Sequence, residues 1–159
     1  MLSQGTVEFL SCGNYSGDMN ELQLSDTDGC EEKKASVGPL VSIVDDDVSV
    51  RRSTQRLLGS SGLRAKAFAS AEDFLQSGCV EETACLLLDM SMPGMNGLAL
   101  QRRLIETGRQ IPIIFLSARA SEDEECRAMR AGAAKFLHKP ACKEVLLQAI
   151  CAALDGATR

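Results

Sequence analysis

The sequence predicts an α/β protein in which a parallel sheet is covered by helices on both faces. One observation is that short apolar runs, several rich in β-branched residues, recur from residue 40 to residue 138. A second is that a segment with helical spacing of its apolar residues follows each run. The alternation is strict, with five strands and five helices, and this order is typical of parallel sheets with right-handed crossovers.

The first half of this pattern begins with a strand at 40–44, where "LVSIV" is largely β-branched. A helix over 48–62 follows and ends at a Ser-Gly pair. Residues 63–68 alternate in polarity, which predicts a less buried strand. Ser70 and Asp73 have the spacing of a capping box, which predicts the start of a short helix over 71–78.

The second half begins with the apolar run at 84–88, which ends at Asp89 and a Pro-Gly turn and predicts a strand buried on both faces. Gly108 ends the next helix, and Gly132 ends another that begins with four acids, which suit the partial positive charge of a helix N-terminus. The remaining elements are helices over 97–107, 122–131 and 142–154 and strands over 111–117 and 133–138.

The 159 residues have room for one domain, which we assign to residues 39–156. Residues 1–38 are rich in Gly, Ser, Asp and Asn without a helix or strand period, so we expect a disordered extension. This segment carries seven acids and two bases, whereas the other 121 residues carry 15 of each. Without a basic excess, we expect no direct nucleic-acid binding.

No run of 18 apolar residues and no signal peptide is present, so we expect no membrane association and a cytoplasmic location. The seven cysteines show no CxxC spacing and accompany a single histidine, which argues against a zinc site. We expect these cysteines to be reduced thiols.

Polar side chains follow four of the five predicted strands, and ligands of open α/β sheets bind beyond the carboxyl ends of the strands. These side chains are Asp45, Asp46 and Asp47 after the first strand, Asp89 after the third, Ser117 after the fourth and Lys139 after the fifth. Carboxylates gathered at one edge repel one another unless a cation is present, and oxygen ligands suit Mg²⁺. A metal, a lysine and a hydroxyl around one carboxylate fit phosphoryl transfer, with Asp89 as the nucleophile.

Four segments together resemble the response-regulator receiver domain of two-component signalling. They are "VDDD" (44–47), "LLLDMSMPGMNG" (86–97), "IIFLSA" (113–118) and "KFLHKP" (135–140), within a resemblance that covers residues 40–155. The second and fourth are most similar to receivers of nitrogen-fixation-type transcriptional regulators. The resemblance implies a flavodoxin-like (βα)5 doubly wound sheet with strand order 2-1-3-4-5.

The resemblance also implies a role for each site residue. Asp89 would be the phosphoacceptor, and Mg²⁺ would be bound by Asp89, Asp46 and the backbone carbonyl of Ser91, with Asp45 acting largely through water. Ser117 and Lys139 would contact the phosphoryl group. The remaining implied features are Phe136, which with Ser117 would form the conformational switch, and a cis peptide bond between Lys139 and Pro140.

The implied phosphoryl donor is a histidine kinase or a phosphotransfer protein. Phosphorylation would change the affinity of the surface over 121–154 for an unidentified downstream protein, and the resemblance allows for a phosphorylation-dependent dimer. The implied catalysis is limited to phosphotransfer onto the chain itself and its autodephosphorylation.

Three other interpretations compete with this one. A haloacid-dehalogenase-like phosphatase also uses a strand-end aspartate, but its Asp-x-Asp pair is interrupted here by Ser91. A flavodoxin-like FMN binder needs a first loop that cradles phosphate, which Asp45, Asp46 and Asp47 would repel. The third interpretation is a DNA-binding transcriptional regulator, but the five residues that follow Leu154 are too few for a DNA-binding domain. We therefore expect either a stand-alone receiver or a fragment of such a regulator.

Overall fold

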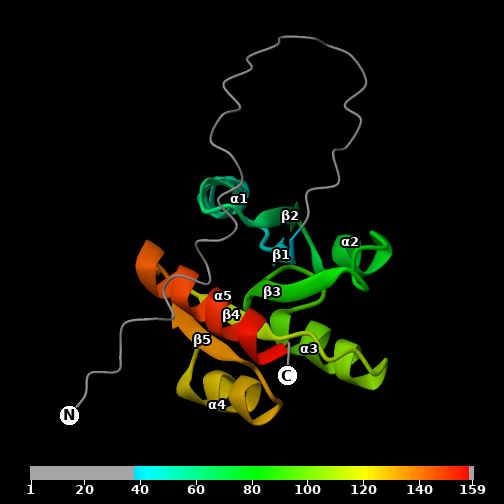
Figure 1. Cartoon of the computed structure of the whole chain (residues 1–159). Helices are drawn as coiled ribbons and strands as arrows, with labels where there is room; N and C mark the ends of the chain where they lie inside the picture. The colour runs from blue at the N-terminus through cyan, green and yellow to red at the C-terminus, as the bar shows by residue number, and fades with distance from the viewer. Residues whose placement is uncertain (1–37, 158–159) are drawn as a thin grey trace, which may run out of the picture.

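The structure is a computed structural model that describes residues 38–157 and contains five strands and five helices in strict alternation (Figure 1). In chain order they are β1 (Leu40–Val44), α1 (Val48–Ser60), β2 (Arg64–Phe68), α2 (Ala71–Gln76), β3 (Thr83–Asp89), α3 (Gly97–Glu106), β4 (Ile113–Ser117), α4 (Glu122–Arg130), β5 (Lys135–His138) and α5 (Lys143–Ala157).

All five strands join one parallel sheet in the order β2-β1-β3-β4-β5. This confirms the predicted fold class and strand order. The order reverses at β1, which lies between β2 and β3, so the carboxyl ends of β1 and β3 flank the point where ligands bind in such sheets.

The predicted strands at 111–117 and 133–138 each begin two residues later in the structure, at Ile113 and Lys135. Pro112 has no N–H to give to a ladder, although its carbonyl accepts a bond from Leu86 at 2.9 Å. The Ala133 N–H instead donates to Ala128 at 3.1 Å and closes the end of α4. Pro112 thus lacks the amide that would extend β4, and the amide of Ala133 is used by α4 rather than by β5.

Two apolar clusters hold the helices on the sheet, one on each face. Helices α1 and α5 pack through Leu58, Leu146 and Ile150 against side chains of β1, β3 and β4. Helices α2, α3 and α4 pack on the opposite face in a cluster that includes Phe74 and Leu100. Both faces of the central strands are therefore buried, which explains why β3 is a continuous apolar run rather than an alternating one.

Several helices begin beside the carboxyl edge of the sheet with a polar cap. Asp47 caps α1, and its Oδ1 accepts bonds from Ser49 N–H at 2.7 Å and Val50 N–H at 3.3 Å. Ser70 caps α2 by accepting a bond from Asp73 N–H at 3.0 Å. The caps fix where each helix begins at this edge. The carboxylate of Asp47 therefore serves as the N-cap of α1.

Some expectations concern residues outside the described range. The predicted disordered extension over 1–38 lies almost entirely outside residues 38–157, and the assignment of a domain to 39–156 stays a prediction. Cys79, Cys85, Cys126 and Cys142 are free thiols, as expected. The expectation of reduced thiols is wrong for Cys151, which takes part in a disulfide. Within 38–157, no helix has the length and apolar character needed to cross a membrane.

Candidate functional site

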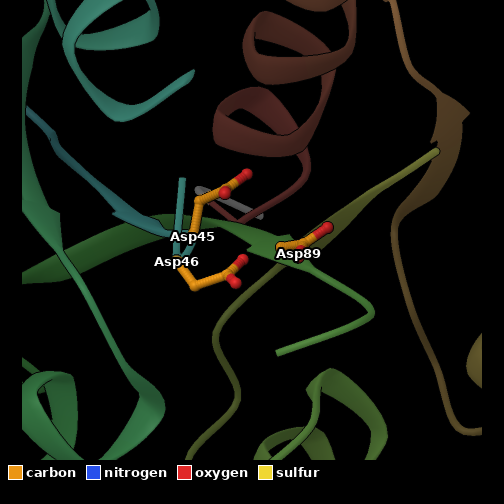
Figure 2. A group of neighbouring side chains, drawn as sticks. All are labelled: Asp45, Asp46 and Asp89. Atoms are coloured by element: carbon orange, nitrogen blue, oxygen red, sulfur yellow. The ribbon is translucent and has the colours of Figure 1, made fainter. Parts of the chain in front are cut away.

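Three carboxylates gather at the carboxyl ends of β1 and β3 (Figure 2). Asp45 and Asp46 follow the last residue of β1, and Asp89 is the last residue of β3. The two strands are adjacent and pair Val44 with Leu88, so their ends arrive side by side. One oxygen from each carboxylate lies within 4.8 Å of the others.

Lys139 brings a positive charge to this cluster from the loop after β5. Its Nζ donates to Asp45 Oδ2 at 2.6 Å and to Asp89 Oδ1 at 3.1 Å. The three residues lie at the ends of three strands, and Lys139 is 94 positions from Asp45 and 50 from Asp89 in the chain. One ammonium group therefore bonds two of the three carboxylates.

Burial and neighbouring charges shift the pKa values of two groups in the cluster, Asp89 and Lys139. The side chains of Asp45 and Asp89 are 3% and 7% exposed, whereas Asp46 is exposed to solvent. Burial raises the pKa of Asp89; the Lys139 ammonium opposes this rise, and the charges of Asp45 and Asp46 add to it. Burial alone would lower the pKa of Lys139, but its bonds to Asp45 and Asp89 outweigh this and raise the pKa.

The other expected site residues lie around the cluster. Ser117, the last residue of β4, is fully buried, and its Oγ accepts a bond from Arg119 N–H at 3.2 Å. Phe136 is 8% exposed and stacks on Phe115 with ring centroids 6.0 Å apart. Ser91 lies two residues beyond Asp89 in an exposed position. The Lys139-Pro140 peptide bond is cis.

Two residues that sequence reasoning did not single out hold the loops of this site. The Arg51 guanidinium donates to the backbone carbonyl of Asp45 at 2.7 Å, which ties α1 to the end of β1. Glu72 of α2 accepts a bond from Met95 N–H at 3.1 Å, which ties α2 to the loop between β3 and α3. Neither residue follows a strand, so a search restricted to strand ends passes over both.

Gly97 is a third residue that sequence reasoning missed. A Cβ atom at this position would lie 2.6 Å from the Asp89 carbonyl oxygen and 2.9 Å from a ring carbon of Phe115. The first residue of α3 therefore needs to be glycine for the helix to begin against the end of β3. The signal in the sequence was an Asn-Gly pair, which equally predicts an ordinary turn.

Asp89→Asn is expected to raise the stability of the metal-free protein at pH 7. Because the folded-state pKa of Asp89 lies above its unfolded value, the folded state binds more protons between these two values, and stability falls as pH rises through this window. Asparagine does not ionise, so the variant does not lose this stability as pH rises. Thermal unfolding in EDTA checks this, and the advantage of the variant is expected to shrink as pH falls toward the ordinary carboxyl pKa. A variant that is less stable than wild type at pH 7 would contradict the expectation.

The donor set fits a magnesium ion. Carboxylate oxygens are the ligands Mg²⁺ prefers, and the ion is usually held by one or two carboxylates while it keeps other positions for water or phosphate. Lys139 supplies one positive charge against the three acids, so a divalent cation would complete the neutralisation. Asp45, Asp46 and Asp89 are the described residues that could hold such an ion.

A comparison with protein-family models matches residues 41–151 to the response regulator receiver domain. Among curated proteins, Nodulation protein W of Bradyrhizobium diazoefficiens is 42% identical over 122 residues, which cover 77% of this chain and 54% of that protein. Response regulator protein TmoT of Ectopseudomonas mendocina is 45% identical over 115 residues, which cover 72% of this chain and 52% of that protein. The chain thus spans about half the length of these relatives.

Solved structures agree with these matches. The response regulator StyR superposes with a TM-score of 0.71 at 42% identity, covering 76% of this chain and 61% of that one. The crystal structure of FixJ-N superposes with a TM-score of 0.66 at 34% identity, covering 73% of this chain and 93% of that one.

Proposed function

Since the chain belongs to the response regulator receiver domain family, we propose that Asp89 accepts a phosphoryl group from a histidine kinase or a phosphotransfer protein. One observation carries this proposal. The Lys139 ammonium bonds both Asp45 and Asp89 while the Asp46 carboxylate lies in the same cluster, so one cation and three carboxylates lie together at one edge of the sheet, as the proposed chemistry requires.

In the proposed reaction, an Asp89 carboxylate oxygen attacks the phosphorus of the donor. A bond forms between this oxygen and phosphorus, the bond from phosphorus to the donor's leaving group breaks, and that group departs with the bonding electron pair. Magnesium, when bound, neutralises charge that builds on the phosphoryl oxygens. Lys139 is placed to exchange part of its contact with Asp89 for a phosphoryl oxygen.

Ser117 would bind the transferred group from the adjacent strand. Its Oγ already accepts a bond from Arg119 N–H, and none of the hydrogen bonds recorded for residues 38–157 uses its hydroxyl proton as a donor. That proton would donate to a phosphoryl oxygen. We propose that this change repositions Phe136, whose ring stacks on Phe115 two residues before Ser117.

The surface formed by α4, β5 and α5 would carry the output. Exposed apolar side chains on it include Met129, which is 43% exposed, and Val145, which is 42% exposed. We propose that phosphorylation changes its affinity for a downstream protein or for a second copy of the chain. The chain's own catalysis would be limited to its phosphorylation and dephosphorylation. Its location would be the cytoplasm, as expected from the sequence.

Magnesium is expected to stabilise the protein, and Asp46→Asn is expected to remove most of this effect. A ligand at about 100 times its dissociation constant adds about 2.7 kcal/mol to the free energy of unfolding. Thermal unfolding with increasing MgCl₂ measures it. Asp47→Asn is the matched control, because the neighbouring acid caps α1 and asparagine caps helices equally well. Equal stabilisation of the two variants would contradict the assignment of Asp46 as a ligand.

A second candidate is favoured by the length of the relatives. Response regulator protein TodT and Transcriptional regulatory protein TdiR are each about twice as long as the segment they share with this chain, which covers 51% and 50% of them. On this interpretation the chain is the receiver of a larger DNA-binding regulator. Its phosphoacceptor chemistry would be unchanged, and the surface of α4, β5 and α5 would contact the rest of that protein.

A further inference from the structure

The loop between β3 and α3 continues directly from Asp89 and borders the candidate site. Its first residue, Met90, donates its N–H to the Leu116 carbonyl at 3.2 Å, and its last residue, Asn96, caps α3. Between these two ends, residues 91–95 form neither helix nor strand. The shape of this middle part therefore depends on what other elements contribute to it.

A single hydrogen bond holds the backbone of this middle part. The Met95 N–H donates to Oε1 of Glu72 at 3.1 Å, and residues 91–95 form no other hydrogen bond within the described residues 38–157. The side chains of Met92 and Met95 also pack in the apolar cluster on this face. Apolar packing has no direction, whereas a hydrogen bond fixes the orientation of a peptide group. Glu72 therefore decides how this peptide group lies.

Gly94 brings the loop close to the same carboxylate. Its φ is +77°, and a Cβ atom there would lie 3.1 Å from Glu72 Oε1. Glycine permits both the left-handed backbone and the close approach. The carboxylate thus lies against two consecutive residues of the loop, Gly94 and Met95.

Glu72 itself is held by a firmly packed helix. Helix α2 begins at its N-cap Ser70, whose hydroxyl accepts a bond from Asp73 N–H at 3.0 Å. The side chains of Ala71 and Phe74 are fully buried in the apolar cluster that α2 shares with α3 and α4. The half-buried Glu72 side chain leaves this anchored helix and presents a fixed acceptor to the loop.

We propose that Glu72 is a positioning residue for Mg²⁺, which holds the loop between β3 and α3 in the arrangement that the ion requires. This inference rests on the proposed binding of Mg²⁺ at Asp45, Asp46 and Asp89. The loop starts at the last of these acids, and it contains Ser91, whose carbonyl the family resemblance implies as a further ligand. When only a fraction of the molecules has the binding arrangement, the apparent affinity falls by that fraction.

An NMR titration of the full-length chain with MgCl₂ tests this role. Glu72→Ala is expected to weaken Mg²⁺ binding about three- to ten-fold, as for a loop that has the binding arrangement in about a tenth to a third of the molecules. Glu72→Gln is expected to stay within about two-fold of wild type, because its amide oxygen accepts the same bond from Met95. Unchanged affinity in Glu72→Ala would overturn the proposal.

Two controls lie in the same helix. Ser70→Ala removes the N-cap and destabilises α2 but leaves the Glu72 carboxylate in place, and Asp73→Asn removes another acid of the first turn. Both variants are expected to bind Mg²⁺ like wild type. An equal weakening in Ser70→Ala would mean that Glu72 acts only through the stability of α2. A weakening in Asp73→Asn and Glu72→Gln as large as in Glu72→Ala would mean that only charge matters. Either result would overturn the proposal.

Amide hydrogen exchange in EDTA provides a readout that needs no metal. The Met95 amide is expected to exchange about ten-fold faster in Glu72→Ala than in wild type, as for the loss of one hydrogen bond to a charged group. The Leu100 amide, which bonds the Asn96 carbonyl at 3.0 Å, is the internal control and is expected to be unchanged. Equal exchange of Met95 in the two proteins would overturn the proposal.

The titration also separates this inference from the proposed function. Failure of wild type to bind Mg²⁺ would refute the proposed site and this inference with it. Normal binding by wild type with equal affinity in Glu72→Ala would overturn the inference alone.

Discussion

Asp89→Asn is expected to reduce phosphorylation by acetyl phosphate and Mg²⁺ more than about a hundred-fold, to below detection. The amide of asparagine cannot form the acyl phosphate that an aspartate nucleophile forms. The substitution keeps the size of the side chain and its place at the end of β3, so loss of the fold does not account for the effect. Intact mass spectrometry measures it, as the appearance of one added phosphoryl group per chain.

Asp47→Asn is the control for this experiment, since it removes an acid two residues from Asp45 without touching the cluster. It is expected to be phosphorylated like wild type. Beryllofluoride, which mimics a phosphoryl group, is expected to shift the thermal unfolding of wild type and Asp47→Asn but not of Asp89→Asn. Phosphorylation of Asp89→Asn at the wild-type rate would place the acceptor at another residue and refute the proposed function.

Gly97→Ala is expected to destabilise the protein by about 3 kcal/mol. The added carbon would lie 2.6 Å from the Asp89 carbonyl oxygen and 2.9 Å from the Phe115 ring, so α3 must shift away from the end of β3. The loss corresponds to a fall of about 10 °C in the midpoint of thermal unfolding. Because the strained contact includes the backbone of Asp89, the affinity for Mg²⁺ is expected to weaken as well.

Gly59→Ala provides the matched comparison in α1. A Cβ atom there meets nothing within 4 Å, so alanine is expected to stabilise the helix by about 0.5–1 kcal/mol. The two glycines thus predict shifts of opposite sign from the same chemical change. A Gly97→Ala variant within about 0.5 kcal/mol of wild type would show that α3 is not held tightly against β3.

The site could be predicted from the sequence in its residue types but not in its contacts. A carboxylate, hydroxyl or lysine at a strand end is visible in the sequence because parallel strands end at one edge. Arg51 and Glu72 were not visible, since each contacts a loop whose position depends on how its helix packs. The sequence also did not show that Asp45 is buried and bonds Lys139, whereas Asp46 is exposed.

By itself, the sequence determined that this protein is a five-stranded parallel α/β domain and which polar side chains stand at its strand ends. Those properties follow from periodicity and local turn chemistry, which act over a few residues. The tertiary structure alone decided that one ammonium group reaches two acids 94 and 50 positions away, and that only glycine fits where α3 meets Asp89. Such distances depend on how the helices pack on the sheet, to which residues from every strand contribute at once.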